Sequence, residues 1–440
     1  MYGFLRRFIG ADPPEAAAWF LGLSALHGAR WGACAAAAAL AAPGPGRAAL
    51  FALGAAILEP FLPTLFPAPF AATQLFHLPT VPCLELYGEA GPALLVAAVN
   101  AALFLLLARR SARTLALAAA CAAALAANEA WGRRRIAQVE ALAAARPVLR
   151  AGLVQGGRRP AAPPEPDRFA QDIPLYADLT RRAVAGGASE LVVWPESTYA
   201  GVLDYDLEAP AGVLSGGRPL AEALRAEGAP LGPLLFNAIG RGADGRERNV
   251  SVLTDSSGAA AGVTEKTLLA PFGEYMPGGR ALSWLYRISP LTGRLSHGTG
   301  SRVLSAGPAR VGVMICYESF IPAPAERLAG LGANLLIAQT NDSWFDGTAE
   351  LEEHLRLSVL RAIENRRALL HAANTGVSAA VSPAGRVIAR VEAGRADAIA
   401  WDAPLLDVPT GGPRASRRLF ALTAALWAAG VLWCWKEARA

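Results

Sequence analysis

The chain has 440 residues, which is enough for two or three domains of about 150 residues each. Hydrophobic residues make up 53% of it and its mean hydropathy is +0.30, which is too apolar for a purely soluble enzyme. The net charge of +5 does not indicate nucleic-acid binding, because the arginines are scattered or lie beside apolar stretches and form no basic–aromatic groove pattern. The five cysteines form no CxxC pair or Cys/His cluster, so neither a metal site nor a cofactor is predicted.

Long apolar stretches are concentrated near the two ends of the chain. Four of them approach the length that spans a bilayer, namely 48–67, 91–108, 114–131 and 419–435. Buried core helices are a weaker interpretation, because the four stretches occur together and are nearly free of charge. We therefore predict a helical membrane domain over 1–146, and a linker with one further membrane helix over 406–440.

Two other N-terminal segments are less regular. Residues 16–42 are apolar but contain Arg30, which predicts one interrupted span or two short ones. Residues 68–90 contain Pro79, Pro82 and Gly88, which favours a re-entrant or interfacial segment.

Residues 147–405 alternate between short strand-like and helix-like patterns. The strands are expected at Leu149–Gln155, Leu191–Pro195, Leu234–Ile239, Asn249–Thr254, Ala260–Lys266, Arg310–Cys316, Asn334–Ala338, Leu369–Ala373, Val377–Val381 and Arg386–Val391. Helices are expected at Asp167–Gly186, near 323–331 and at Thr348–Arg367, and loops at Pro160–Pro166 and Pro404–Pro413. This alternation predicts an α/β domain with a mixed sheet covered by helices.

Three residues with complementary chemistry follow three of these strands. Cys316, the only cysteine in the soluble part, ends the apolar run from Val311, and Glu196 ends the run from Leu191. Lys266 follows the third, and it is one of only two lysines among 41 cationic residues, the other being Lys436. Taken alone, such a cysteine is usually a small buried hydrophobe, and such a glutamate or lysine is usually a surface charge.

Together the three supply the roles that acyl transfer needs. A thiol can attack a carbonyl carbon, and a carboxylate can accept the thiol proton. A lysine ammonium is a compact charge that can stabilise the oxyanion, whereas arginine is a bulky planar group. All three residues stand at the carboxyl ends of strands, where α/β sites commonly assemble.

The surrounding motifs carry a more specific resemblance. They are Trp-Pro-Glu-Ser at 194–197, the segment 265–277 with Pro-Phe-Gly-Glu-Tyr, Ile-Cys-Tyr-Glu at 315–318, Asn-Asp-Ser-Trp-Phe at 341–345 and Ala-Asn-Thr-Gly at 373–376. In this order they resemble the nitrilase superfamily, and within it the membrane-bound apolipoprotein N-acyltransferase branch. The resemblance covers about residues 48–435.

This resemblance implies an α-β-β-α sandwich for the soluble domain and a catalytic triad of Glu196, Lys266 and Cys316. It also implies supporting roles for Glu274, Tyr317, Glu318 and Asn249. The implied reaction moves an acyl chain from a phospholipid, through a Cys316 thioester, to the diacylglyceryl-cysteine of an apolipoprotein. The implied location is the bacterial inner membrane, with several spans and the catalytic domain on the periplasmic side.

Two other functions remain open from the sequence. One is a membrane-tethered carbon-nitrogen hydrolase, an amidase or nitrilase with the same triad. The other is a lipoprotein-binding scaffold without activity, which the intact triad disfavours. His297, His354 and His371 are more typical of loop, packing or supporting groups, whereas Glu59 and Asn100 are polar candidates within apolar stretches.

Overall fold

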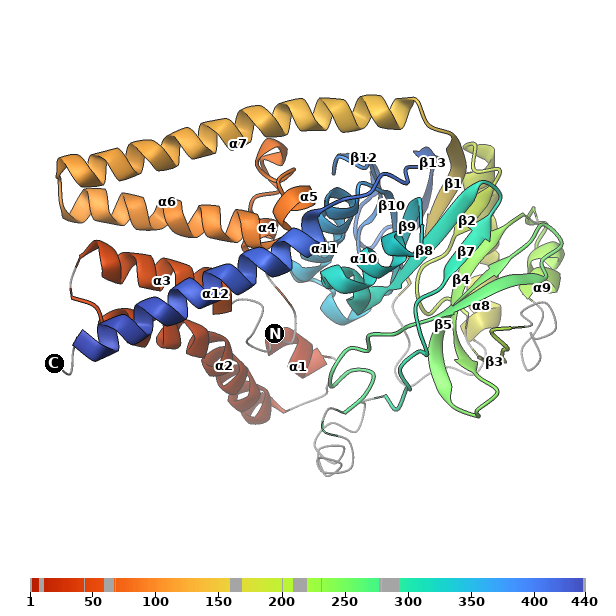
Figure 1. Ribbon diagram of the computed structural model, residues 1–440. Helices are drawn as coiled ribbons and strands as arrows, with labels where there is room; N and C mark the ends of the chain where they lie inside the picture. The colour runs from red at the N-terminus through yellow and green to blue at the C-terminus, as the bar shows by residue number, and fades with distance from the viewer. Residues whose placement is uncertain are drawn as a thin grey trace. The chain divides into compact units, whose positions relative to one another are not determined.

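The computed structural model describes residues 2–7, 12–42, 44–58, 67, 69–158, 168–199, 201–208, 220–230, 232–276, 278 and 293–437. The chain divides into two compact units, residues 1–138 with 409–440, and residues 139–408. Figure 1 labels the helices and strands of both units.

The first unit is helical. Its helices are α1 (Tyr2–Arg7), α2 (Pro13–Ala39), α3 (Pro45–Leu58), α4 (Phe70–Thr73), α5 (Leu84–Tyr87), α6 (Ala90–Ala108), most of α7 (Ala112–Ala144) and α12 (Gly412–Glu437), with a 3-10 turn at Leu78–Thr80. Asp12 caps α2 by accepting a hydrogen bond from the Glu15 amide at 2.9 Å. α3 packs between α2 and α6, and the indole of Trp427 on α12 donates to the Leu50 carbonyl on α3 at 3.0 Å.

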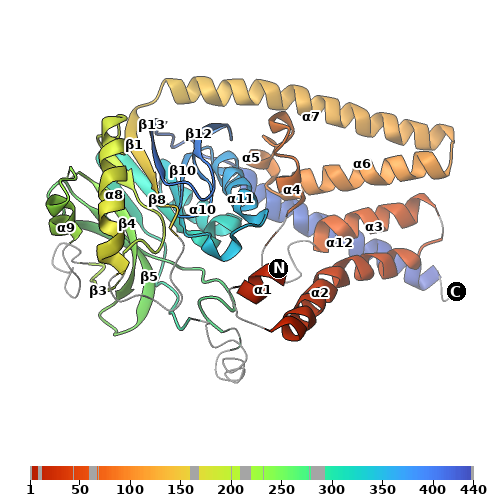
Figure 2. The ribbon, with the colours of Figure 1, turned by 180° about the vertical axis from the view of Figure 1, so that it is seen from behind.

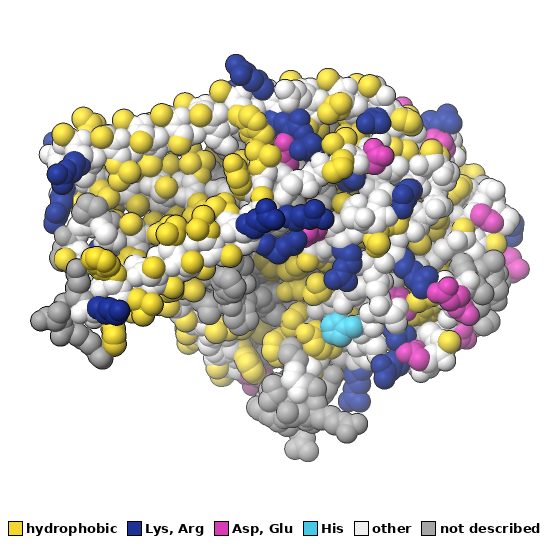
Figure 3. All heavy atoms as spheres, viewed as in Figure 1, with side chains coloured by type: hydrophobic (Ala, Val, Ile, Leu, Met, Phe, Trp, Pro, Cys, Tyr) yellow, Lys and Arg dark blue, Asp and Glu magenta, His cyan; other side chains and the backbone are white. Residues whose placement is uncertain are grey.

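Three of the described helices are long and apolar enough to cross a membrane: Ala90–Ala108, Ala112–Ala144 and Arg414–Lys436. Their outer faces carry exposed side chains such as Phe104, Leu115 and Trp433, and Figure 3 shows hydrophobic side chains gathered over these helices. Apolar surface of this extent fits contact with lipid.

One of the other predicted membrane segments needs correction, and part of another lies outside the described residues. Within 48–67 the structure describes an apolar helix up to Leu58, and 59–66, with Glu59, lie outside the described residues. Residues 16–42 are not interrupted, because α2 continues through Arg30 as one helix of 27 residues. Residues 68–90 contain the short helices α4 and α5, as proline and glycine in this segment predict.

The second unit contains two sheets. The first has the order β13-β1-β2-β4-β5-β6, with β3 also paired to β4, and the second has the order β12-β11-β10-β9-β8-β7. The strands of the first are β1 (Val148–Gln155), β2 (Leu191–Val193), β3 (Val202–Asp204), β4 (Leu234–Arg241), β5 (Glu247–Thr254), β6 (Ala260–Glu265) and β13 (Asp397–Pro404). Those of the second are β7 (Val303–Ala306), β8 (Ala309–Ile315), β9 (Leu335–Thr340), β10 (Ala368–Ala373), β11 (Ser378–Val381) and β12 (Val387–Val391).

Both sheets mix parallel and antiparallel pairs. In the first, β1, β2 and β4 run parallel while β4, β5 and β6 form antiparallel hairpins. In the second, β8, β9 and β10 run parallel and antiparallel strands complete each side. The parallel strands β9 and β10 are buried at every residue, which explains their nearly continuous apolar sequences.

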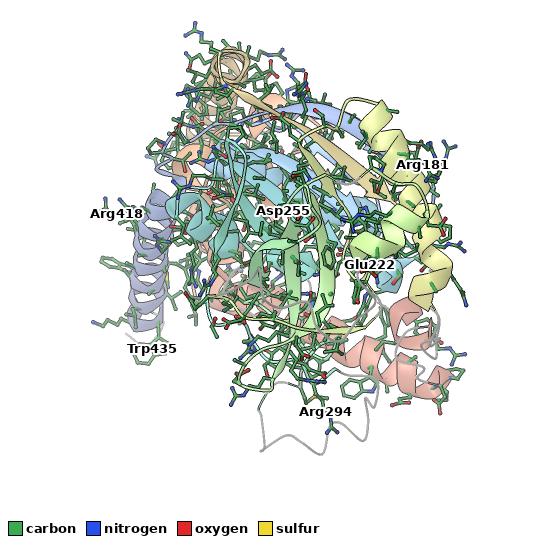
Figure 4. The ribbon with its side chains drawn as sticks, turned by 90° about the vertical axis from the view of Figure 1, so that its right-hand side faces the viewer. Arg181, Glu222, Asp255, Arg294, Arg418 and Trp435 are labelled. Carbon is green, nitrogen blue, oxygen red and sulfur yellow. The ribbon has the colours of Figure 1, made fainter. Side chains whose placement is uncertain are left out.

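Helices cover the outer faces of the two sheets. α8 (Arg168–Ala185) and α9 (Leu220–Ala226) belong to the first sheet, and α10 (Pro322–Gly330) and α11 (Glu350–Asn365) belong to the second. Figure 2 shows α8 lying over the strands of the first sheet, and Figure 4 labels Arg181 on α8 and Glu222 on α9. The predicted α-β-β-α sandwich is therefore confirmed.

Apolar layers lie between the two sheets and between each sheet and its helices. Leu149, Leu191 and Leu235 of the first sheet pack with Val311, Leu335 and Leu370 of the second, so the inner faces meet in one apolar layer. A second cluster packs Leu179 and Ala183 of α8 against Trp194 and Phe236. These layers hold the ends of β2, β6 and β8 in fixed positions.

The sequence patterns missed β3, β7, β13 and α9. β13 pairs with β1 along its whole length, although the loop predicted at Pro404–Pro413 begins at its last residue. Most of β13 is half-buried, so its sequence mixes Asp397, Trp401 and Asp402 with alanines and shows no clear alternation. The loop predicted at Pro160–Pro166 lies outside the described residues.

Candidate active site

The three predicted catalytic residues come from both sheets. Glu196 follows β2 and Lys266 follows β6 in the first sheet, whereas Cys316 directly follows β8 in the second. The side chain of Gln339 on β9 spans the layer between the sheets, donating to the Trp194 carbonyl at 2.6 Å and accepting from Ser251 Oγ at 2.5 Å. Hydrogen bonds as well as apolar packing therefore hold the two sheets together near these residues.

Lys266 lies between two carboxylates. Its Nζ donates to Glu274 Oε1 at 2.8 Å and to Glu196 Oε1 at 3.4 Å. The Lys266 side chain is only 1% exposed, and both glutamates are buried as well. A buried ammonium needs such partners, because an unpaired charge in the interior is strongly unfavourable.

Asn249 and the backbone hold the carboxylates in place. Asn249 Nδ2 donates to Glu196 Oε1 at 2.8 Å and to Glu274 Oε1 at 3.3 Å. The other oxygen of Glu196 accepts from the Asn341 amide at 3.1 Å, and that of Glu274 accepts from the Ala270 amide at 2.7 Å. Each carboxylate thus has a fixed orientation before any substrate binds.

Cys316 stands at a strained point of the backbone. It has φ 51° and begins a 3-10 turn, η4 (Cys316–Phe320), directly after the extended strand β8. The left-handed region is uncommon for residues other than glycine and is frequently found at functional sites. Cys316 is half-buried, and a side-chain hydrogen bond joins it to Glu196.

Glu318 connects the turn of Cys316 to the loop of Lys266. Its Oε1 accepts from the Thr267 amide, the Thr267 hydroxyl and the Leu268 amide at 2.8, 2.6 and 3.1 Å. Its Oε2 accepts from the Ile315 amide at 2.9 Å. Burial raises the pKa of this carboxyl, although the hydrogen bonds from Ile315 and Thr267 act against burial.

Opposing effects act on the three central groups. Burial raises the pKa of the Cys316 thiol well above its ordinary value, and Glu196 acts in the same direction while Lys266 acts against it. Burial also raises the pKa of Glu196, by more than Lys266 lowers it. Burial lowers the pKa of Lys266, but Glu274 and Glu196 outweigh burial and hold that pKa above its ordinary value.

As a result of these shifts, Cys316 is a neutral thiol that lies beside a base, Glu196, and a permanent cation, Lys266. The thiol does not ionise by releasing its proton to water, because burial and the neighbouring carboxylate disfavour a free thiolate. Transfer of the thiol proton to Glu196 leaves the net charge of the cluster unchanged. The arrangement can therefore activate the thiol at the moment when a carbonyl is attacked.

The other predicted residues occupy different positions. Tyr317 lies on the same turn as Cys316 and packs edge-on against Phe320, with ring centroids 5.6 Å apart. His297 bonds the Thr267 carbonyl through Nδ1 at 3.0 Å, and Asn100 donates to Val96 of its own helix at 2.8 Å. Among the described residues, no group of three or more His, Cys, Asp or Glu side chains could hold a metal ion.

Sequence reasoning missed three polar residues that hold the site together. Asn237 donates to Asn249 Oδ1 at 2.7 Å and accepts from the Ser197 amide at 2.9 Å. Asn341 and Gln339 make the bonds to Glu196 and Trp194 given above. The sequence offered one signal for two of them. Asn237 and Gln339 are polar residues inside the mostly apolar strands Leu234–Arg241 and Leu335–Thr340.

Comparison with known proteins agrees with this fold. The model of the carbon-nitrogen hydrolase family matches residues 135–401, which is more than half of the chain. The chain therefore belongs to the carbon-nitrogen hydrolase family.

Several curated relatives carry the name apolipoprotein N-acyltransferase. The protein from Geobacter metallireducens is 30% identical over 333 residues, covering 74% of this chain and 62% of that protein. Those from Bdellovibrio bacteriovorus and Sinorhizobium medicae are 33% and 35% identical, covering 46% and 48% of this chain and 37% and 40% of the relatives. The chain thus spans less than two thirds of the length of each.

Among solved structures, an amidase of Nesterenkonia from the nitrilase superfamily aligns with 63% of this chain and 97% of its own, at 20% identity and a TM-score of 0.42.

Proposed function

We propose that this chain is an apolipoprotein N-acyltransferase. It takes an acyl chain from a phospholipid, holds it as a thioester on Cys316, and transfers it to the α-amino group of the N-terminal diacylglyceryl-cysteine of an apolipoprotein. The observation that carries the proposal is a buried Glu196–Lys266 pair beside Cys316 in a chain whose other unit exposes membrane-length apolar helices. The names of the curated relatives support the same reaction.

In the first half reaction, Cys316 attacks the ester carbonyl of the phospholipid. Glu196 accepts the thiol proton as the sulfur–carbon bond forms, and the carbonyl oxygen becomes an oxyanion beside the Lys266 ammonium. The tetrahedral intermediate then collapses and breaks the ester bond. The leaving alkoxide of the lysophospholipid takes the proton from Glu196, which leaves the acyl group on sulfur and the carboxylate ionised again.

In the second half reaction, the α-amine of the apolipoprotein attacks the thioester carbonyl. Lys266 again stabilises the oxyanion, and Glu196 accepts a proton from the attacking nitrogen. Collapse breaks the carbon–sulfur bond and the Cys316 thiolate regains a proton from Glu196. One site performs both halves in turn, which predicts ping-pong kinetics.

The proposed reaction accounts for the connection of the catalytic domain to membrane segments. Both proposed substrates are lipids, so a soluble unit alone would lack access to them. In the proposed arrangement the chain is a multi-pass protein of the bacterial inner membrane, with domains at 1–146, 147–405 and 406–440 and the catalytic domain facing the periplasm. Its partners are the phospholipid donor, the apolipoprotein acceptor and the bilayer itself.

A membrane-tethered carbon-nitrogen hydrolase is the second candidate, because the family whose model matches this chain takes its name from that reaction. The two functions differ in their donor and acceptor. A hydrolase transfers the acyl group of a small amide or nitrile to water and releases ammonia, whereas the acyltransferase retains the acyl group until an amine arrives.

Intact-mass analysis of the purified protein tests the proposal. After incubation with phospholipid vesicles, we expect an adduct with the mass of one acyl chain that maps to Cys316 and is removed by hydroxylamine. Adding a peptide with an N-terminal diacylglyceryl-cysteine should clear the adduct and produce the N-acylated peptide. Ammonia release from simple amides, together with no adduct from phospholipid, would establish the hydrolase instead.

A further inference from the structure

A buried polar cluster lies directly behind the turn of Cys316. Asp342 begins the 3-10 turn η5 (Ser343–Phe345) after β9, His354 lies on α11, and Ser319 lies on η4. His354 Nδ1 lies 2.6 Å from Asp342 Oδ1, and His354 Nε2 lies 2.8 Å from Ser319 Oγ. All three side chains are fully buried and form one hydrogen-bonded pathway. The reaction proposed above gives this pathway no role.

The pathway reaches the nucleophile through the backbone. Ser319 Oγ donates to the carbonyl oxygen of Cys316 at 2.9 Å. That carbonyl belongs to the residue whose φ is 51°, a conformation that persists only where surrounding contacts determine it. Ser319 is therefore one of the contacts that can hold Cys316 in place.

Both ring nitrogens of His354 have a partner in this pathway. Asp342 Oδ1, which also accepts from Thr340 Oγ1 at 2.7 Å, faces Nδ1, and Ser319 Oγ faces Nε2. Replacement of the ring therefore removes a contact on each side of it.

Acidic groups lie around His354. Burial raises the pKa of Asp342, but the ring of His354 and the bond from Thr340 outweigh burial and hold it below its ordinary value. Glu350, on the same helix, is a further acidic group that interacts with His354.

His371 is the remaining titratable neighbour, and its ring meets that of His354 edge-on at 5.1 Å. Burial, reinforced by His354, lowers the pKa of His371 to about 3, so this second ring stays neutral. Within the described residues, neither ring nitrogen of His371 has a hydrogen-bond partner. Among these residues, His371 therefore adds no hydrogen bond to the pathway.

We propose that His354 is a positioning residue for the nucleophile, which pairs with Asp342 and, through Ser319, fixes the turn holding Cys316. It touches neither substrate nor the reacting sulfur. The inference rests on the proposed role of Cys316 as the nucleophile but is independent of which acyl donor or acceptor the protein uses.

Alkylation of Cys316 by iodoacetamide tests the positioning role, and it requires neither phospholipid nor apolipoprotein. His354→Gln and Asp342→Asn should slow alkylation at Cys316, followed by peptide mass, and should lower kcat of thioester formation by about 100-fold with little change in KM. Asp342 has φ 59°, a conformation that asparagine tolerates, so the second variant tests charge at nearly constant shape.

Ser358→Ala is the matched control, because Ser358 is buried on the same helix and its Oγ has no partner among the described residues. It should alkylate within about 2-fold of the wild type. Wild-type rates in both Asp342→Asn and His354→Gln would overturn the positioning role. Slowed alkylation in both variants of a protein that forms no acyl adduct from phospholipid would refute only the proposed acyltransferase.

Discussion

The carboxylate of Glu318 receives two hydrogen bonds from Thr267, one from its amide at 2.8 Å and one from its hydroxyl at 2.6 Å. Thr267 directly follows Lys266, and Glu318 stands two residues after Cys316. This relationship joins the loop that carries the cation to the turn that carries the thiol. The distance between the two reactive groups therefore depends on a carboxylate that need not touch a substrate.

Glu318→Gln should weaken this connection between the Lys266 loop and the Cys316 turn. The amide keeps one oxygen for Thr267 but turns an NH2 group toward the Ile315 amide, so a buried donor loses its acceptor. We expect unfolding to become about 1–3 kcal/mol easier, together with a lower rate of thioester formation. Thermal unfolding and adduct formation measure the two effects.

Glu222→Gln on the exposed surface of α9 is the control, and it should lie within about 0.5 kcal/mol of the wild type. Equal effects of the two substitutions would show that Glu318 does not join the two loops.

Lys266→Arg should reduce thioester formation by about 100- to 1,000-fold, because a planar guanidinium cannot occupy the buried space of a compact ammonium that donates to the oxyanion. Lys436→Arg is the matched control, since it changes the only other lysine, which is exposed on α12. Unfolding temperatures should be recorded for both. Activity of a folded Lys266→Arg within a few-fold of the wild type would make Lys266 a structural cation.

Glu196→Gln should abolish thioester formation while phospholipid remains bound, because the amide keeps the shape of the side chain but cannot accept a proton. Lipid retention and hydroxylamine-released acyl groups should be measured on one preparation, with Cys316→Ala as the control that lacks the acyl carrier. Thioester formation at the wild-type rate would transfer the role of base to Glu274 or Glu318.

The pH dependence of Cys316 alkylation should reveal the same base. Burial raises the pKa of Glu196 above the ordinary value of 4.5, so its ionised, proton-accepting form appears only as the pH rises through that higher value. The rate of alkylation should therefore rise in a step as the pH increases through this range in the wild type. The same step should be absent in Glu196→Gln. A step that survives in the variant belongs to another group.

Asn249→Asp should move that step to higher pH. Asn249 Nδ2 donates to Glu196 and Glu274, and an aspartate would replace this donor with a third carboxylate. Like charges close together disfavour ionisation, so the pKa of Glu196 should rise further and thioester formation near neutral pH should slow. An unchanged pH profile would mean that Asn249 does not control the ionisation of Glu196.

The sequence was sufficient to locate the three central residues, because each follows a buried strand whose apolar run is easy to recognise. It was not sufficient for the Asp342–His354–Ser319 pathway. These residues lie on three different elements that only the folded chain brings together, and each is ordinary in its own local pattern. β13 was missed for a related reason, since pairing with β1 stabilises a segment with little strand character of its own.

The membrane segments show a different limit. Composition suggested a break at Arg30, yet α2 continues through it as one helix. A single arginine is compatible with helix geometry, so its charge affects membrane insertion more than it affects backbone structure.

The two carboxylates around Lys266 also have a protective consequence. An acyl thioester on Cys316 would stand close to the primary amine of the enzyme's own lysine, and an unprotonated amine would capture the acyl group as a stable amide and end the enzyme's working life. Glu274 and Glu196 outweigh burial and keep the pKa of Lys266 above its ordinary value, so its nitrogen has no lone pair available for attack. In the proposed reaction, the pairing that suits Lys266 to stabilise an oxyanion would thus also prevent self-acylation and reserve the acyl group for the amine of the incoming substrate.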